Sequence, residues 1–374
     1  VRATAAGREP VQADPYQAPG GVSPACVDDE EQAVTLRAPY YQHEGVTIYH
    51  GDCLSVLPEL PDNSVDLVLT DPPYFKVKGD AWDNQWDKPA EFLAWLDRVL
   101  EEFARILKPN GSLYLFASPQ MGARVECLIG QRFEVMTNIR WRKENSAHKK
   151  SCKEELRVFF PASETIIFAE HFGADNAAKG EAGYERKCDE LRGFIFEPLR
   201  AYFDEERKRS GLSSQQIQDG MAELTGVRYV FDRHTFSTSQ WELPTKQQYE
   251  AARVLFNRAG GEFLRREYEE LRREYEELRR PFFVSAKVPY TDVWDFETVG
   301  NYPGKHVCEK PAAMLRHMIS ASSKPGAVVL DAFGGSGSTA QAARELGRSA
   351  ILIELDERWC KRQVAMLSQG SLFR

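Results

Sequence analysis

Two short apolar segments, far apart along the chain, each run into an aspartate and then into a turn. Residues 65–70 (VDLVLT) lead into residues 71–74 (DPPY), and residues 328–330 (VVL) lead into residues 331–339 (DAFGGSGST). A brief apolar run that stops at Pro or Gly is typical of a buried strand. Strands that alternate with helices form a parallel α/β sheet. The two segments therefore predict one sheet that is assembled from both ends of the chain.

Other segments continue this alternation. The clearest helix covers residues 89–107, where apolar residues recur every three or four positions. A Pro-Asn-Gly turn separates it from the next strand. The sequence predicts strands over 46–50, 112–117 and 350–354, and helices over 53–60, 89–107 and 340–346, with a last helix from Asp356.

Composition narrows the class of protein. The chain has 374 residues, and 48 Lys plus Arg against 56 Asp plus Glu give a formal net charge of −8. That balance argues weakly against a protein that coats nucleic acid or a membrane surface. No apolar stretch approaches the roughly 18 residues of a membrane helix, and the start of the chain lacks a secretory pattern. The seven Cys are scattered without zinc-ligand spacing, so we expect free thiols, no metal site and a cytoplasmic protein.

The Gly-rich segment after Asp331 indicates a nucleoside site. Glycines after a strand let the backbone approach a ligand, and the following helix presents its N–H groups. The segment has no Lys, so it is not a P-loop, and its glycines do not form the dinucleotide fingerprint GxGxxG. Glu354, at the end of the next strand, can accept hydrogen bonds from ribose hydroxyls. These features predict a nucleoside-containing cofactor that needs no pyrophosphate site; a tight turn without a ligand is the alternative.

Residues 71–74 suit a ligand that carries an amino group. Consecutive prolines hold the backbone rigid and extended and donate no hydrogen bonds. Their carbonyls are then fixed acceptors beside the Asp71 carboxylate, and Tyr74 adds an aromatic face. Two acceptors and a stacking surface fit a planar group with an NH₂. The alternative is a rigid turn that only ends the strand.

Taken together, Asp-Pro-Pro-Tyr at 71–74 and Phe333-x-Gly335-x-Gly337 resemble the amino methyltransferases of DNA. These enzymes transfer a methyl group from S-adenosylmethionine to adenine N6 or cytosine N4. The motif order resembles the β-class, and residues 306–311 (HVCEKP) resemble the segment before its Gly-rich motif. The resemblance implies an α/β, Rossmann-like methyltransferase sheet, circularly permuted so that the catalytic motif precedes the cofactor motif. A mostly helical target-recognition insertion would lie between them.

On this resemblance the chain divides into four parts. Residues 1–38 would be a flexible extension, residues 39–145 the catalytic half, residues 146–300 the DNA-binding insertion and residues 301–374 the cofactor-binding half. The insertion contains RREYEEL twice, at 265–271 and 272–278, which predicts a helix with one narrow apolar seam. That seam either packs onto its own domain or forms a homodimer contact.

The resemblance also implies contacts with each part of S-adenosylmethionine. Lys310 and Thr339 would lie near its carboxylate, Glu354 would hold the ribose hydroxyls, and Asp52 would hold the adenine amino group. Residues of the Gly-rich segment would face the methionine portion; they are Asp331, Phe333, Gly335 and Gly337.

The implied chemistry is direct methyl transfer to a base flipped out of double-stranded DNA. Tyr74 would stack on the base, while Asp71 and the Pro72 carbonyl, held by Pro73, would accept the two amino hydrogens. The amino nitrogen would then attack the sulfonium methyl in line, by positioning and electrostatics. No Pro-Cys dipeptide occurs, so the nucleophile of cytosine-C5 methyltransferases is missing. Protein glutamine methyltransferases carry Asn-Pro-Pro-Tyr instead.

In the β-class that the chain resembles, Asp at the first motif position, here Asp71, favours adenine N6 as the target, with cytosine N4 as the alternative. A DNA-binding regulator without catalysis is a remote alternative, because the catalytic and cofactor motifs are complete. The recognition sequence, the presence of a cognate restriction endonuclease and the oligomeric state stay open, although the repeat helix favours a dimer.

DNA contacts would come from the middle of the chain. Residues 140–157 carry seven basic and three acidic residues, a balance of 7 − 3 = +4, and such a run can bind phosphates or be a solvated loop. Residues 212–226 faintly resemble a helix-turn-helix. The predicted phosphate-binding residues are Arg140, Arg142, Lys143, Lys149, Lys150 and Lys153.

Overall fold

The computed structural model describes residues 37–77, 79–143, 157, 159, 161–171, 196–237, 241–258, 260–284 and 290–369. Within these ranges, one sheet has the strand order β1-β2-β9-β8-β3-β4-β6-β5-β7. The strands are β1 (Tyr41–His43), β2 (Val46–His50), β3 (Val65–Thr70), β4 (Leu107–Ala117), β5 (Glu134–Arg142), β6 (Ser163–Glu170), β7 (Val293–Trp294), β8 (Val328–Asp331) and β9 (Ser349–Glu354).

The centre of the sheet joins the two ends of the chain. Strand β3 pairs in parallel with β8, in the register Leu67↔Val329 and Val68↔Leu330, and β9 lies between β8 and β2. The apolar segments that end in Asp71 and Asp331 are therefore neighbours, although 261 residues separate Thr70 from Asp331. The predicted α/β sheet is confirmed.

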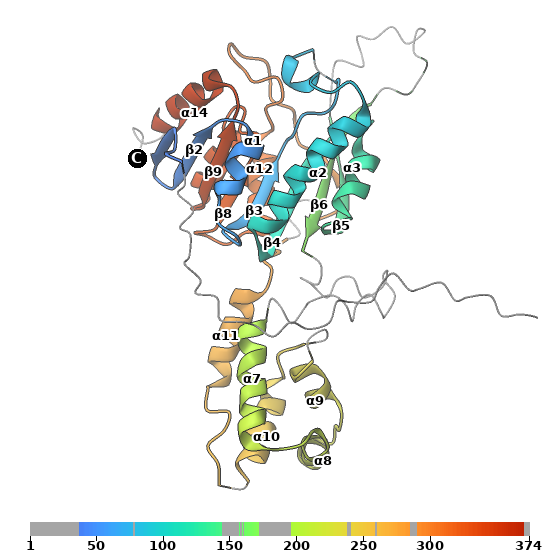
Figure 1. Cartoon of the computed structure of the whole chain (residues 1–374), viewed down its shortest axis with the longest axis vertical. Coiled ribbons are helices and arrows are strands. Elements are labelled where there is room, and N and C mark those ends of the chain that lie inside the picture. The colour runs from blue at the N-terminus through green and yellow to red at the C-terminus, as the bar shows by residue number, and fades with distance from the viewer. Residues whose placement is uncertain are drawn as a thin grey trace, which may run out of the picture. The chain divides into compact units, whose positions relative to one another are not determined.

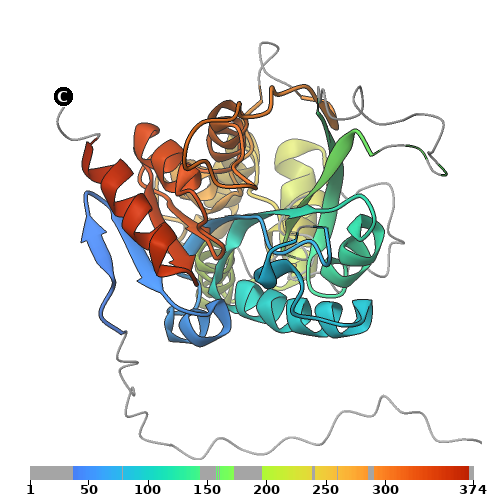
Figure 2. The ribbon, with the colours of Figure 1, turned by 90° about the horizontal axis from the view of Figure 1, so that it is seen from above.

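Helices cover both faces of the sheet and bury two separate apolar clusters. One face is covered by α1 (Cys53–Val56), α2 (Pro89–Ile106) and α3 (Gly122–Ile129), and the other by α12 (Ala312–Ser322), α13 (Ser338–Glu345) and α14 (Glu357–Gln369), as Figures 1 and 2 show. Helix α2 follows its predicted spacing, because Phe92, Leu96 and Phe103 face the sheet and are fully buried. Each such side chain stabilises the fold by about 1.5–3 kcal/mol.

A second group of helices has a core of its own. It consists of α7 (Glu197–Ser210), α8 (Ser214–Thr225), α9 (Val230–Thr235), α10 (Lys246–Asn257) and α11 (Tyr268–Leu278). Ser213 and Thr245 cap α8 and α10 by accepting hydrogen bonds from the third backbone N–H of each helix. Trp241 and Tyr249 are fully buried among the apolar residues of this cluster.

The repeated heptads pack within this helical group. Tyr268 and Leu271 are buried, and Tyr275 stacks on Phe196 with ring centroids 4.9 Å apart. The seam thus meets its own domain, as one of the two alternatives predicted.

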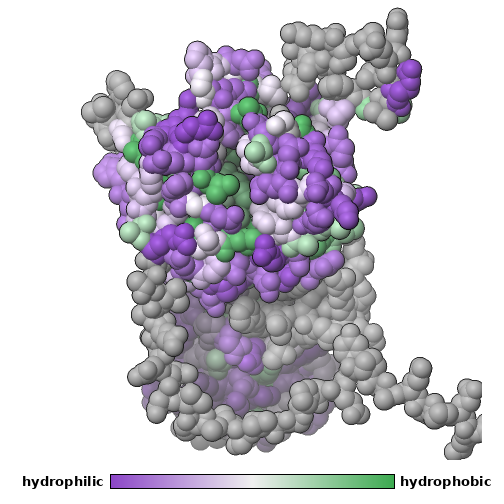
Figure 3. Space-filling model, turned by 45° about the horizontal axis from the view of Figure 1, so that its top comes forward, coloured by the Kyte–Doolittle hydropathy of each residue, from purple (hydrophilic) through white to green (hydrophobic). Residues whose placement is uncertain are grey.

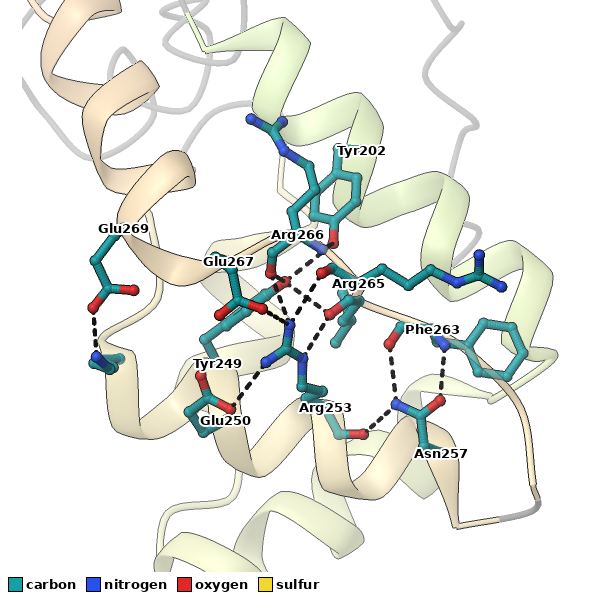
Figure 4. Close-up of polar contacts among 12 residues, drawn as sticks. Tyr202, Tyr249, Glu250, Arg253, Asn257, Phe263, Arg265, Arg266, Glu267 and Glu269 are labelled. Atoms are coloured by element: carbon teal, nitrogen blue, oxygen red, sulfur yellow. Dashed lines mark hydrogen bonds and ion pairs between the residues drawn. The ribbon is translucent and has the colours of Figure 1, made fainter.

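The first heptad is only partly helical, because α11 begins at Tyr268. Figure 4 shows the reason: Tyr249 and Arg253 on α10 point at the non-helical backbone that precedes α11. The Tyr249 hydroxyl donates to the Arg266 carbonyl at 2.7 Å, and Arg253 Nε donates to the Leu264 carbonyl at 2.8 Å. These bonds engage carbonyls that an earlier helix start would have used.

The predicted insertion over 146–300 is too wide. Strand β6 lies between β4 and β5 in the sheet, and β7 pairs with β5, yet both fall inside that range. The apolar residues of β6 are buried because both faces of the sheet are covered there. The other predicted boundaries stay predictions, and residues 1–36 lie outside the described part of the chain. No helix in the described ranges combines the length and apolarity needed to cross a membrane.

Candidate active site

A cavity of about 710 Å³ opens where β3, β8 and β9 end. This volume is within the range of about 300–1,000 Å³ for small-molecule sites. On the face shown in Figure 3, apolar side chains gather in a hollow that hydrophilic residues surround. The wall includes residues from both motifs: Asp52, Asp71, Pro72, Pro73, Tyr74, Lys310, Asp331, Phe333, Gly335, Thr339 and Glu354. Gly337 is the one predicted cofactor residue outside this wall, at the N-cap of α13.

Asp331 holds the Gly-rich segment in place. Its carboxylate accepts hydrogen bonds from Thr70 Oγ1 at 2.9 Å and Thr339 Oγ1 at 2.7 Å. It also accepts from the backbone N–H of Phe333 at 3.1 Å. Burial raises the pKa of Asp331 to about 6, although these donors oppose the rise. The carboxylate therefore joins the end of β3 to the start of α13.

The glycines leave space that side chains would fill. Gly335 adopts φ +47° and Gly337 adopts φ +83°, in the left-handed region that favours glycine. A Cβ on Gly335 would lie 3.2 Å from the His306 ring, and one on Gly337 would lie 2.9 Å from Gln363. A side chain at either position would therefore crowd His306 or Gln363.

Glu354 and Asp52 present carboxylates on the β9 and β2 side of the cavity. The Glu354 oxygens accept from the backbone N–H groups of Gly335 at 2.7 Å and Asp356 at 2.8 Å. A carboxylate has about four lone-pair sites, so acceptor capacity remains for ribose hydroxyls. Burial raises the pKa of Glu354. Asp52 caps α1 through Leu54 N–H at 2.8 Å and lies at the exposed rim.

Lys310 holds one oxygen of the Asp71 carboxylate. The Lys310 ammonium donates to Asp71 Oδ2, and Lys310 Nζ also lies 3.2 Å from the Tyr74 hydroxyl oxygen. The second oxygen, Asp71 Oδ1, is buried and has no hydrogen-bond partner among the described residues. Burial raises the pKa of Asp71, and the charge of Lys310 opposes that rise. One carboxylate oxygen is therefore fixed while the other stays available as an acceptor.

The contacts of Lys310 lie at the catalytic motif, and its predicted place at the cofactor carboxylate stays a prediction. Its side chain is 8% exposed and its Nζ lies 4.6 Å from the Phe116 ring centroid and 5.3 Å from that of Tyr74. Burial lowers the pKa of Lys310, but Asp71 and Glu164 outweigh this and raise it overall. Lys310 therefore stays positively charged in this position.

Glu164 completes the polar cluster and was missed at the level of sequence. Its Oε2 accepts from the Tyr74 hydroxyl at 3.2 Å and lies 3.6 Å from Lys310 Nζ, and Lys143 pairs with its other oxygen. Burial raises the pKa of Glu164, but Lys310 and Lys143 outweigh this and lower it overall. Glu164 is the second residue of β6, in a segment with no motif that would have identified it.

Other wall residues were also missed. His306 lies edge-on to Trp359 with centroids 4.5 Å apart, beside the Gly-rich segment. Trp95 packs on Phe333 at 5.8 Å, which joins α2 to the same segment. In the sequence, the only indication of this part of the cavity wall was that His306 belongs to residues 306–311 (HVCEKP).

The residues predicted to contact DNA lie in different surroundings. Arg140 donates to Thr165 Oγ1 at 2.8 Å, Arg142 pairs with Asp295 at 2.6 Å, and Lys143 pairs with Glu164. The first two side chains start from the exposed face of β5, whereas Lys143 is 21% exposed and belongs to the cluster around Tyr74. Lys149, Lys150 and Lys153 lie outside the described residues.

The cavity fits the charge of S-adenosylmethionine. Acidic residues outnumber basic ones in its wall, with Asp52, Asp331 and Glu354 near the Gly-rich segment, and this suits a cationic sulfonium. The close-approach glycines and the free lone pairs of Glu354 suit the nucleoside portion. Asp71 lines the same cavity, next to these acidic residues.

Comparison with known proteins decides the family. Residues 65–366 match the model of the N6/N4 DNA methylases, which is more than half of the chain. This chain belongs to the DNA methylase family. It is a DNA amino-methyltransferase that uses S-adenosylmethionine, as the resemblance implied. That the motif order is a circular permutation stays a prediction.

Individual relatives are distant but cover most of the chain. The DNA adenine methyltransferase YhdJ of Escherichia coli (strain K12) is 24% identical over 337 residues, which are 88% of this chain and 85% of that protein. The type II methyltransferase M2.LlaDCHI of Lactococcus lactis subsp. cremoris is 23% identical over 354 residues, or 91% and 96% of the two chains. The solved PvuII DNA methyltransferase (cytosine-N4-specific) is 15% identical, covers 87% of each chain and has a TM-score of 0.49.

Proposed function

We propose that this DNA methylase transfers the methyl group to adenine N6 in double-stranded DNA. The observation that carries the proposal is that Asp71 lines the cavity with one carboxylate oxygen fixed by Lys310, while the other, Oδ1, is a buried acceptor without a partner among the described residues. An exocyclic amino group supplies the donor that this oxygen lacks. Aspartate at the first motif position favours adenine over cytosine N4, and a relative named a DNA adenine methyltransferase supports that choice.

The target adenine would enter the cavity by flipping out of the duplex, because its amino nitrogen is otherwise paired. Asp71 Oδ1 and the Pro72 carbonyl would accept the two amino hydrogens, and the Tyr74 ring would stack on the base. These bonds draw the nitrogen lone pair out of ring conjugation. The nitrogen then forms a bond to the methyl carbon as the carbon–sulfur bond breaks, and the excess amino proton leaves afterwards.

The bound cofactor supplies the electrophilic methyl group. Asp331, Glu354 and the Gly-rich segment would hold it, with Thr339 near its carboxylate and Asp52 near its adenine. The basic residues between 140 and 157 would hold the DNA backbone, and the cytoplasmic location is part of this proposal. Replacing Lys149 and Lys150 with Ala should weaken binding to all duplexes and reduce the salt slope by about 2.

Product analysis tests the proposal. The protein is incubated with mixed-sequence duplex DNA and methyl-labelled S-adenosylmethionine, and the DNA is digested to nucleosides for mass spectrometry. We expect N6-methyladenine. N4-methylcytosine would overturn the choice of base, and tight DNA binding without label would favour a regulator that lacks catalysis.

A further inference from the structure

The turn that follows the catalytic motif is strained. Phe75 and Lys76 have φ +62° and +59°, although neither is glycine. Two successive residues with a Cβ in the left-handed region are unfavourable, so something in the surroundings must hold them. Such strain is found where a backbone is held for function. Here it starts one residue after Tyr74.

One buried side chain holds both ends of this turn. Asp83 is fully buried, and its Oδ1 accepts the Tyr74 backbone N–H at 2.6 Å while Oδ2 accepts the Val77 backbone N–H at 2.7 Å. The Asp83 carbonyl also accepts the Lys76 backbone N–H at 2.8 Å. Asp83 thus bonds to residues before and after the strained pair, and to the second member of that pair.

Asp83 links this turn to the wall of the cavity. Asp83 ends the short 3₁₀ helix η2 (Ala81–Asp83), whose Trp82 lines the cavity together with Asp71 and Tyr74. Phe75 packs on Phe92 of α2 at 5.9 Å. A shift of the turn would therefore move the backbone of Tyr74 and, through the rigid prolines, the Pro72 carbonyl.

We propose that Asp83 is a positioning residue for methyl transfer: it holds the left-handed turn at Phe75 and Lys76 and so fixes the acceptors and the stacking ring of residues 71–74. Asp83 acts through the backbone N–H groups of Tyr74 and Val77. The inference rests on the proposed function, because a positioning role presupposes transfer to a base amino group.

The test compares Asp83→Asn with Asp87→Asn, an exposed acid in the same loop. An amide keeps one acceptor oxygen, so one of the two N–H groups loses its partner. Single-turnover methyl transfer is measured with labelled S-adenosylmethionine and mixed-sequence duplex, and cofactor affinity by calorimetry. We expect Asp83→Asn to transfer about 10²-fold more slowly, as for a small misplacement of reacting groups. Cofactor affinity should change less than about threefold, and Asp87→Asn should match the wild type.

A second substitution separates positioning from general packing. Glycine adopts positive φ without the Cβ penalty, so Lys76→Gly should recover several-fold of the lost rate in the Asp83→Asn background. If Asp83→Asn fails to fold, the double variant should recover folding and transfer together.

The outcomes are distinct. Equal rates for the two Asn variants would overturn the role of Asp83, as would a double variant that recovers neither rate nor folding. A wild-type protein that labels no DNA would overturn the proposed function instead.

Discussion

The two motif aspartates end neighbouring strands, yet their carboxylates are used in opposite ways. Asp331 accepts three hydrogen bonds from within the fold, two from threonine hydroxyls and one from a backbone N–H. Asp71 is bonded at one oxygen by the Lys310 ammonium, and its other oxygen has no partner among the described residues. Thr70, which donates to Asp331, immediately precedes Asp71, so one strand end supplies both arrangements.

This difference distinguishes a carboxylate that stabilises the fold from one that can bind a substrate group. A buried carboxylate whose oxygens are bonded within the fold can hold a loop, but it offers little to a substrate. A buried oxygen without a donor costs free energy, about 1–3 kcal/mol for an unsatisfied group. Such a cost is offset when a ligand supplies the donor. Asp331 therefore supports the Gly-rich loop, and the contacts of Asp71 support the proposal that it binds the amino group.

The largest effect should come from Asp71→Ala. The variant removes the free acceptor and leaves Asp331 and Glu354 in place, so methyl transfer should fall by about 10²–10³-fold or more, while cofactor affinity stays within a few-fold. Transfer is measured with labelled S-adenosylmethionine, and binding by calorimetry. A variant that no longer binds the cofactor would show that Asp71 has been assigned the wrong role.

Asp331→Asn should change the free energy of unfolding, by an amount that depends on pH. Because the pKa of Asp331 is raised to about 6 in the fold, the native protein binds this proton more tightly than the unfolded chain does. Stability from this group is therefore greatest at low pH and declines as pH rises from about 4 to about 6. The decline approaches about 3 kcal/mol, at 1.36 kcal/mol per pKa unit.

The asparagine variant lacks this titration. Urea unfolding is measured at pH 4, 5, 6 and 7. As the pH rises, the free energy of unfolding of the wild type should fall relative to that of Asp331→Asn. Parallel curves for the two proteins would mean that Asp331 titrates normally and that its hydrogen bonds fully compensate the burial of its charge.

Local patterns predicted the elements that carry these two aspartates. The apolar runs of β3 and β8 and the spacing of α2 are properties of adjacent residues, and the structure confirms them. The contact between Lys310 and Asp71 joins residues 239 positions apart, and no local pattern specifies it. Glu164 was missed for the same reason, because its role comes from the pairing of β6 with β4 and β5.

The heptads show the same limit in another region. Two identical copies of RREYEEL have equal helix propensity, yet residues 265–267 are not helical and α11 starts at Tyr268. Hydrogen bonds from Tyr249 and Arg253 to the backbone of 264–266 decide the difference. Tertiary contacts thus override a repeat that is perfect in sequence.

We expect the smallest effect from Lys310→Met. This variant gives the sharpest test of the difference between Asp71 and Asp331, because it leaves Asp71 as a buried acid without a neighbouring cation. Burial already raises the pKa of Asp71, and loss of the Lys310 charge removes the effect that opposes it. More of the carboxyl is then protonated at neutral pH, and a protonated Asp71 accepts the amino hydrogen poorly. Transfer at pH 7 should fall about tenfold for each unit by which the pKa exceeds the assay pH.

The pH profile of Lys310→Met distinguishes the two roles of this lysine. If Lys310 sets the ionisation of Asp71, the transfer rate of the variant should rise from pH 7 to pH 9 toward that of the wild type, with cofactor affinity little changed. If Lys310 instead binds the cofactor carboxylate, the variant should lose cofactor affinity at every pH, and saturating S-adenosylmethionine should restore the rate. Lys310→Arg is the matched control, since it keeps the charge beside Asp71 and should keep the wild-type profile.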